Sequence, residues 1–329
     1  PAAEALAAAG IEPLVLAEKE GLALINGTDG MLGQLVLACH DLAGLLTTAD
    51  VVAALSVEGL MGTDRVLAED LHAMRPHPGQ GMSAATMRAV LAGSPIVERH
   101  RDDPDCPIVQ DAYSLRCAPQ VTGAARDTLV HAMLVAQREL ASVIDNPVVT
   151  PDGRVESNGN FHGAPIAYVL DFLAIAVADV ASMSERRTDR FLDAKRNHGL
   201  SPFLADDPGV DSGHMILQYM QAGVVAELKR LAVPASVDSI PSSAMQEDHV
   251  SLGWHAARKL RRSLDGLTRV LAGEALTAAR ALDLRELGSA PATAAVVAAI
   301  RERVPGPGPD RYLAPEIESV VGLVASGAV

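Results

Sequence analysis

Aromatic residues are scarce in this chain: they make up 3% of its 329 residues, although hydrophobic residues as a whole make up 49%. The core must therefore be filled by Ala, Leu and Val. Ala and Leu are the strongest apolar helix formers, so the composition favours an all-α fold. The length suits one large domain or two ordinary ones.

Basic residues, cysteines and long apolar runs are also limited, and each shortage excludes a class of protein. The formal net charge is −14, which argues against a nucleic-acid groove lined with Lys and Arg. Cys39, Cys106 and Cys117 are odd in number and lack metal-ligand spacing. We therefore expect no disulfide framework, no metal site and a reducing, cytoplasmic compartment. No run approaches the roughly 18 uninterrupted apolar residues of a membrane span, so no membrane partner is expected.

Long helical patterns dominate the chain from residue 119 onward. They predict helices over residues 119–144, 164–192, 212–232 and 248–282. The third helix is apolar around most of its circumference, which calls for burial inside a bundle or an oligomer. We expect one mostly helical domain over residues 1–329. The polar joints at 156–163 and 236–247 lie at helix ends, where chemistry would be placed.

The remaining stretches predict shorter elements. A helix is expected over residues 29–45, with a break at Thr47-Thr48, where a hydroxyl can cap the next helix. Residues 74–81 and the acidic, proline-broken run 101–107 are expected to be loops. Residues 148–155, with Pro-Asp-Gly at their centre, predict a small hairpin.

Two polar clusters in the first half of the chain are candidate site segments. Leu-Ile-Asn-Gly-Thr at 24–28 places Asn26 beside a glycine and a hydroxyl, a pattern that a helix-capping turn also explains. Gln110, Tyr113 and Arg116 follow at spacings of three, so on one helical turn they would share a face. Arg116 could bind a carboxylate through two hydrogen bonds, and Tyr113 could exchange a proton with a reacting group. A solvated helix start is the alternative.

Two further clusters occupy the polar joints. Glu-Ser-Asn-Gly-Asn-Phe-His-Gly at 156–163 predicts a loop that approaches something closely, although His162 could be purely structural. The other joint ends in Glu247-Asp248 beside His249. These acids could serve acid–base chemistry or cap the helix that follows, because acidic side chains favour a helix start. The sequence contains no phosphate-binding loop, dinucleotide fingerprint or zinc motif.

Together the four clusters resemble those of histidine ammonia-lyases, in the same order and spacing and over essentially the whole chain. The resemblance implies the all-α fold of the ammonia-lyase and fumarase-like superfamily, with long central helices bundled together. It implies conversion of L-histidine into trans-urocanate and ammonia, the first step of histidine degradation. It also implies a homotetramer whose active sites draw residues from three subunits.

The resemblance assigns roles to individual residues. Asn26, Gln110 and Tyr113 would hold the cofactor and the substrate's amino end, with Tyr113 as a catalytic residue. Arg116 would pair with the substrate carboxylate, and Phe161 would line the pocket beside the cofactor.

Glu247, the second catalytic residue implied, is the one that favours histidine as the substrate. It would meet the imidazole ring, whereas relatives that act on uncharged rings tend to carry Gln there. A phenylalanine or tyrosine ammonia-lyase, or an aminomutase on the same scaffold, is the nearest alternative. A non-catalytic helical scaffold fragment is the alternative from another class, but it would need neither Glu247 nor Arg116.

The implied cofactor is 4-methylidene-imidazol-5-one (MIO), which the family makes by cyclising an internal Ala-Ser-Gly. The sequence contains that tripeptide at 325–327, in what we expect to be a tail too loose to compress the backbone. The family carries it upstream of the Asn-Gly-Thr motif. The chain begins without Met, so we expect a cofactor-bearing N-terminal portion to be absent. The tyrosine assigned as β-proton base and a ring-contacting loop histidine would belong to it, and the chain alone should be inactive.

Overall fold

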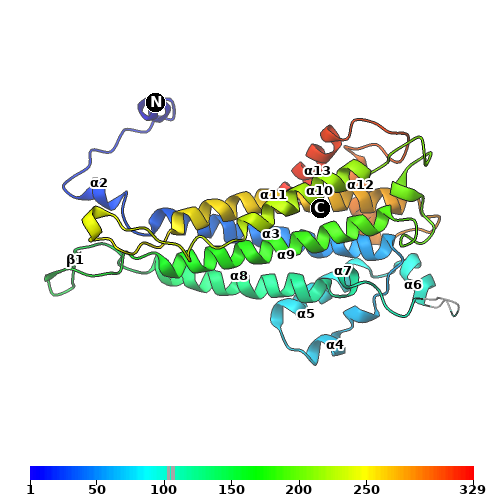
Figure 1. Cartoon of the computed structure of the whole chain (residues 1–329), viewed down its shortest axis with the longest axis horizontal. Helices are drawn as coiled ribbons and strands as arrows, with labels where there is room; N and C mark the ends of the chain where they lie inside the picture. Colours follow the sequence, from blue (N-terminus) through cyan, green and yellow to red (C-terminus); the bar gives the residue numbers. More distant parts are fainter. Residues whose placement is uncertain (102–103, 105–107) are drawn as a thin grey trace.

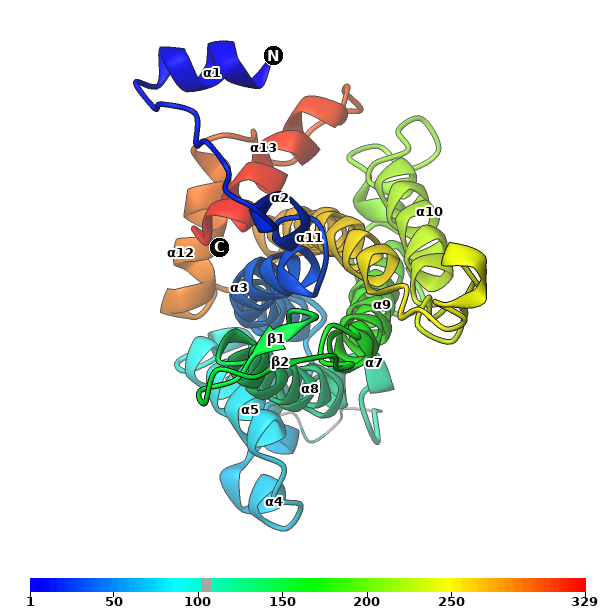
Figure 2. The ribbon, with the colours of Figure 1, turned by 90° about the vertical axis from the view of Figure 1, so that its left-hand side faces the viewer.

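A computed structural model describes residues 1–101, 104 and 108–329. It confirms the all-α prediction, since long helices run side by side along the molecule (Figure 1). The long helices are α3 (Asp29–Gly59), α8 (Ala118–Leu140), α9 (Ala164–Leu192), α10 (Met215–Leu231) and α11 (Gly253–Asp283). Viewed along the bundle, α3, α8, α9 and α11 enclose the core, and α10 packs against α9 and α11 from outside (Figure 2).

Shorter elements surround this bundle. Helices α12 and α13 cover one side of it, and α4 and α5 extend from another (Figure 2). These elements are α1 (Ala2–Ala8), α2 (Glu20–Ala23), η1 (Arg65–Leu67), α4 (Glu69–Ala73), α5 (Pro78–Val90), α6 (Pro95–Arg101), α7 (Tyr113–Arg116), β1 (Val148–Val149), β2 (Val155–Glu156), η2 (Pro202–Leu204), η3 (Ser243–Met245), α12 (Pro291–Arg301) and α13 (Ala314–Ser326).

Leucine and alanine fill the core, as the shortage of aromatics requires. On α11 the buried side chains of Leu260, Leu264, Leu267 and Leu271 recur at helical spacing and face α3 and α9. Fully burying each such side chain contributes about 1.5–3 kcal/mol. This continuous apolar stripe therefore fixes α11 at the centre of the bundle.

A buried ion pair ties three of the core helices together. Arg187 on α9 donates its Nη2 to Glu274 Oε2 on α11 at 2.8 Å, and Ser56 Oγ on α3 donates to Glu274 Oε1 at 2.5 Å. All three side chains are buried. Removing one partner of such a pair costs about 3–5 kcal/mol, because the other charge is left unpaired. The network therefore holds α3, α9 and α11 in one register.

Several expected elements are confirmed. The helix predicted over 164–192 is α9 without change, and the other three long helices are present with ends shifted by one to five residues. The expected hairpin is the antiparallel pair of β1 and β2, in which Val148 lies opposite Glu156.

Three expected boundaries are wrong. There is no break at Thr47-Thr48: Thr47 Oγ1 donates to Ala43 O at 3.2 Å and Thr48 Oγ1 to Val329 O at 2.8 Å, so α3 continues to Gly59. The loop expected over 74–81 stops early because α5 begins at Pro78, and proline suits a first helical turn.

The third wrong boundary is the start of the loop expected over 101–107. Arg101 belongs to α6 and so does not begin a loop. Residues 102–103 and 105–107 of that expected loop lie outside the described residues.

Two helices, α3 and α9, are long and apolar enough to cross a membrane by length and composition alone. In these helices, 56% and 61% of the most apolar window is buried inside the fold. Such burial is typical of the core helices of a bundle.

Candidate active site

Tyr113 and Arg116 meet on the single turn of α7. The Arg116 guanidinium carbon lies over the Tyr113 ring, 4.6 Å from its centroid, a distance that suits a cation–π contact. Tyr113 is 69% exposed. The Nε of Arg116 is buried and has no hydrogen-bond partner among the described residues. An unpaired guanidinium donor beside an exposed phenol is an arrangement that can receive a carboxylate.

Gln110 does not share this helical face, so the expectation of one turn carrying all three residues is wrong for it. Helix α7 begins only at Tyr113, and Ala112 before it is extended, with φ −62° and ψ 154°. Asp111 Oδ2 accepts the backbone N–H of Thr63 at 2.8 Å, which holds this segment outside the helix. Gln110 is exposed in the bend that precedes α7.

Arg187 positions α7 from beneath, a role that the sequence analysis missed. Its Nη1 donates to the Ser114 carbonyl at 3.1 Å, while its other nitrogens engage Glu274. Arg190 lies one turn further along α9. Burial lowers its pKa, the positive charge of Arg196 lowers it further, and the negative charge of Asp111 partly offsets the shift. The polar run 185–190 within an apolar helix was the available signal, but it did not reveal which of these side chains point inward.

Asn26 lies in the loop before α3, at the opposite end of the bundle. Thr28 is fully buried and donates Oγ1 to Glu139 Oε1 at 2.7 Å, so its hydroxyl does not cap α3 as the alternative interpretation supposed. Gly27 has φ +85°, and a Cβ there would lie 3.1 Å from Ile144 Cδ1, which favours glycine. The Asn26 carboxamide is exposed near the positive end of a long helix.

Phe161 lies at this same end, in a loop over residues 157–163 that we call the Phe161 loop. Its backbone and side chains bond to the segment after α8: Asn158 N–H donates to Asn146 Oδ1 at 2.9 Å, and Asn158 Nδ2 donates to Asp145 O at 3.0 Å. The ring of Phe161 is 41% exposed. Gly163 is the last residue of the loop. A Cβ at this position would lie 2.7 Å from Met31 Sδ, which favours glycine.

Glu247 is exposed, and Ser242 Oγ donates to its Oε2 at 2.7 Å. The interpretation of Glu247-Asp248 as a helix cap is wrong. Helix α11 begins at Gly253, and Leu252 at its N-cap is left-handed, with φ 50°. The carboxylate of Glu247 is therefore free to meet a ligand.

The six candidate residues thus form two groups that one chain does not bring together. Asn26, Phe161 and Glu247 lie where α3, α9 and α11 begin, whereas α7 packs on Arg187, near the far end of α9. At about 1.5 Å per residue, Ala164 and Arg187 are roughly 35 Å apart along α9. Figure 1 shows the two ends, with α2 and β1 at one and α7 towards the other.

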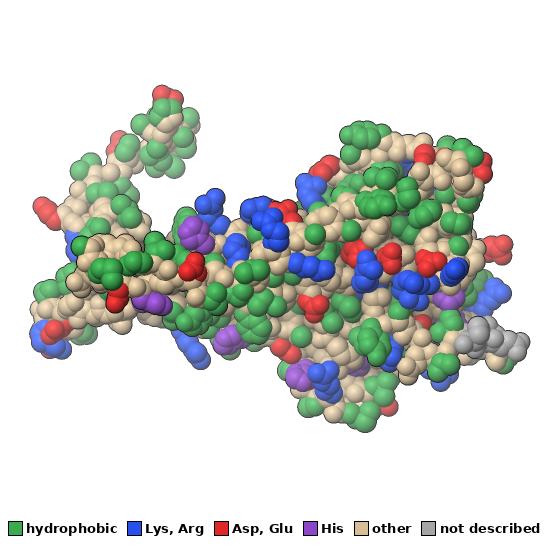
Figure 3. Space-filling view, in the orientation of Figure 1, with side chains coloured by type: hydrophobic (Ala, Val, Ile, Leu, Met, Phe, Trp, Pro, Cys, Tyr) green, Lys and Arg blue, Asp and Glu red, His purple; other side chains and the backbone are tan. Residues whose placement is uncertain are grey.

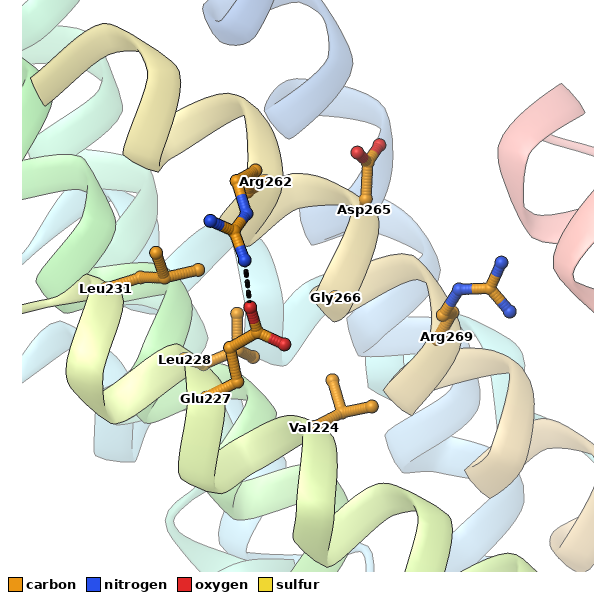
Figure 4. A pocket seen from close by; sticks show the side chains of 8 residues that line it. All are labelled: Val224, Glu227, Leu228, Leu231, Arg262, Asp265, Gly266 and Arg269. Atoms are coloured by element: carbon orange, nitrogen blue, oxygen red, sulfur yellow. Dashed lines mark hydrogen bonds and ion pairs between the residues drawn. The ribbon is translucent and has the colours of Figure 1, made fainter. Parts of the chain in front are cut away.

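A groove between α10 and α11 has a volume of about 220 Å³ (Figure 4). Arg262 and Glu227 form an ion pair across it. The groove is lined by Val224, Glu227, Leu228, Leu231, Arg262, Asp265, Gly266 and Arg269. None of the six candidate residues lines it, so it is separate from the predicted site.

The family model for aromatic amino acid lyases matches residues 1–302 of this chain. The chain belongs to the aromatic amino acid lyase family. Over 331 residues it is 67% identical to a histidine ammonia-lyase of Streptomyces avermitilis, covering 100% of this chain and 64% of that protein. It is 49% identical to a histidine ammonia-lyase of Sorangium cellulosum, covering 100% and 65%.

Solved structures of this lyase family share the fold. A tyrosine aminomutase from Streptomyces globisporus has a TM-score of 0.91 at 40% identity, covering 99% of this chain and 65% of that one. A histidine ammonia-lyase from Trypanosoma cruzi has a TM-score of 0.89 at 39% identity, covering 99% and 61%. The chain spans about 64% of the length of the Streptomyces avermitilis relative.

Proposed function

We propose that this chain is part of a histidine ammonia-lyase, which eliminates ammonia from L-histidine to give trans-urocanate. The observation that carries the proposal is the exposed carboxylate of Glu247, because an acid at this position suits an imidazole ring better than a phenyl ring. The identity of 67% to a histidine ammonia-lyase supports it. The free thiols of Cys39 and Cys117 support a cytoplasmic location.

Different side chains bind the substrate and transfer the proton. Arg116 binds the substrate carboxylate with its planar guanidinium, whose Nε is unpaired and whose face stacks on the Tyr113 ring. The Tyr113 phenol oxygen can hold or move a proton near the substrate. Glu247 accepts the imidazole N–H, and Phe161 and Gln110 complete the pocket wall.

An MIO group fits the chemistry of the residues assigned to hold it when Asn26 and Tyr113 come from different subunits, because one chain places them at opposite ends of the bundle. Asn26 presents an exposed carboxamide at the positive end of α3, and Tyr113 presents an exposed phenol. The amino group of the substrate is a poor leaving group, and MIO, when bound, supplies the electrophile that its departure requires. The remaining requirement, orientation of the substrate against that electrophile, falls to Arg116 and Glu247.

We further propose a homotetramer whose active sites combine residues from different subunits. Tyr168, Phe172 and Ile175 form an exposed apolar stripe along α9, and Val130, Met133 and Leu134 lie exposed on α8. Figure 3 shows hydrophobic side chains gathered over these two helices. A large exposed apolar face supports association with further copies. Association would also bring Arg116 of one subunit near Glu247 of another, which one chain alone keeps apart.

Mixing two inactive variants should restore activity if sites are shared in this way. We expect the full-length gene product with Arg116→Ala, or with Glu247→Ala, to be inactive. Co-expression should restore about a quarter of normal turnover, because about a quarter of randomly mixed sites take Arg116 from a Glu247→Ala copy and Glu247 from an Arg116→Ala copy. Urocanate absorbance measures the recovery, and a co-expressed pair carrying Arg116→Ala on both copies is the control. Absence of recovery in mixed oligomers of confirmed size would refute shared sites.

A substrate panel tests the proposed reaction. The full-length gene product should form urocanate from L-histidine with a kcat/KM at least about tenfold above that for L-phenylalanine or L-tyrosine, since those rings leave Glu247 unpaired. The likeness to a tyrosine aminomutase makes that reaction the second candidate. Appearance of a β-amino acid, or preference for tyrosine, would favour the aminomutase and overturn the proposal.

A further inference from the structure

Two loops with candidate site residues meet through a pair of histidines. His162 follows Phe161 in the Phe161 loop, and His249 lies in residues 239–250, which we call the Glu247 loop. The two imidazole rings stack with their centroids 5.3 Å apart and their planes 21° apart. His162 Nε2 lies 3.2 Å from His249 Nδ1, within hydrogen-bonding distance. We call these two residues the histidine pair.

The Glu247 loop is otherwise closed on itself. At its base, Ser239 Oγ donates to Val250 O at 3.2 Å and accepts the Val250 N–H at 2.8 Å. At its tip, Ser242 and Glu247 exchange backbone hydrogen bonds of 2.9 and 3.3 Å. Among the hydrogen bonds of the described residues, only the histidine pair joins this loop to a segment distant in sequence. Without it, the loop could swing as a unit and carry the Glu247 carboxylate with it.

The Phe161 loop is a firm partner by contrast. Besides the Asn158 bonds described above, Asn160 N–H donates to Asn158 Oδ1 at 2.8 Å and Asn160 Nδ2 to Val143 O at 3.5 Å. His162 is therefore held beside the segment that follows α8 and beside the start of α9. A contact to His162 fixes the Glu247 loop relative to the bundle.

The hydrogen bonds around the histidine pair determine which nitrogen carries each proton. The Ala164 N–H donates to His162 Nδ1 at 3.4 Å, so that nitrogen is unprotonated and Nε2 carries the hydrogen. His162 Nε2–H then donates to His249 Nδ1, which places the hydrogen of His249 on its Nε2. The pair therefore requires a hydrogen-bond acceptor at the Nδ1 position of His249.

From this geometry we propose that His162 and His249 are positioning residues that hold the Glu247 carboxylate where it meets the substrate ring. The inference rests on the proposed function. It concerns residues that need not touch the substrate and that act through Glu247. Their loss should therefore weaken ring recognition more than it weakens the elimination step itself.

A double-mutant cycle in the full-length gene product tests the proposal. His162→Leu and His249→Leu should each lower the ratio of kcat/KM for L-histidine to that for L-phenylalanine about fivefold to tenfold, the size expected for one net hydrogen bond. The loss should appear mainly as a higher KM for histidine. The double variant should lose no more than either single one, because both remove the same contact. His255→Leu, at an exposed histidine six residues further along, is the matched control and should change nothing.

His249→Asn provides the rescue. The Asn carboxamide oxygen takes the place of Nδ1 and can accept from His162 Nε2–H, so this variant should recover most of the selectivity that His249→Leu loses. Three results would overturn the proposal. The losses in the kcat/KM ratio could multiply in the double variant, or His249→Asn could lower the ratio as much as His249→Leu does. The third is an equal loss of kcat/KM on both substrates.

If the unsubstituted protein forms no urocanate, the proposed function fails, and the pair is then tested by melting temperatures. Non-additive shifts in the same four-member cycle would show that the two histidines are in contact, and additive shifts would overturn that contact and the positioning role with it.

Discussion

A purified polypeptide of residues 1–329 is expected to form no urocanate from L-histidine. The elimination needs an electrophile for the amino group, and the sequence contains Ala-Ser-Gly only at 325–327. Ala325 and Ser326 lie in the last turn of α13, so the expectation of a loose tail there is wrong. Ser326 Oγ donates to Leu323 O at 3.0 Å, and Gly327 N–H donates to Val324 O at 3.1 Å.

This helical geometry disfavours cyclisation as strongly as a loose tail would. Gly327 has φ 73° and ends the helix, and its N–H is already bonded. Ring closure would need that nitrogen to approach the Ala325 carbonyl in a compressed backbone, which a surface helix end does not enforce. Activity should therefore fall below detection, far beyond the effect of any single substitution.

The measurement is urocanate absorbance, paired with intact mass. A chimera that places residues 1–329 in the Streptomyces avermitilis enzyme, in place of the matching 331 residues, is the positive control and should be active. Urocanate formed by the isolated polypeptide would contradict the prediction. So would the loss of two waters mapped to residues 325–327.

Local sequence signals predicted the elements that depend on local chemistry. Gly163 and Pro165 bracket the start of α9, and its bounds were predicted correctly. The Thr47-Thr48 break failed because both hydroxyls bond to carbonyls, one of them at the distant Val329. A contact between residues 281 positions apart has no signature in a local window.

The candidate site was predictable in its residues but not in its arrangement. The spacing placed Tyr113 and Arg116 together, as the structure has them, yet Gln110 was drawn out of the helix by the tertiary bond between Asp111 and Thr63. No local pattern in the sequence indicated that Arg116 and Glu247 lie at opposite ends of a long bundle. Helix length and packing decide that separation, and they emerge only from the fold.

Glu247→Gln should strongly lower the ratio of kcat/KM for L-histidine to that for L-phenylalanine, whereas Arg116→Lys should leave this ratio unchanged. Arg116 meets a carboxylate that all amino-acid substrates share, so it cannot discriminate among them. Lys at this position lacks the planar fork and the stacking on Tyr113, so rates on both substrates should fall together. Glu247 meets the part of the substrate that differs.

The size of the Glu247 effect follows from hydrogen-bond energies. Against an imidazole N–H the carboxylate gains a charged hydrogen bond, whereas against a phenyl ring it is desolvated and unpaired, at a cost of about 1–3 kcal/mol. Since 1.36 kcal/mol corresponds to tenfold, the histidine-to-phenylalanine ratio of kcat/KM should fall by roughly one to two decades. The substitution is conservative for the loop, because the amide oxygen can still accept from Ser242 Oγ, as Oε2 does now at 2.7 Å.

The comparison therefore separates recognition from folding. Both variants should keep the melting temperature of the unsubstituted full-length protein within a few degrees, since Glu247 is exposed and the Arg116 stack lies at the surface of α7. With folding intact, kcat/KM for L-histidine and L-phenylalanine in the three proteins isolates the role of each side chain. An unchanged ratio after Glu247→Gln would mean that the carboxylate does not read the ring. The preference for histidine would then have to reside in residues other than Glu247, and the assignment of the substrate would lose its main support in this chain.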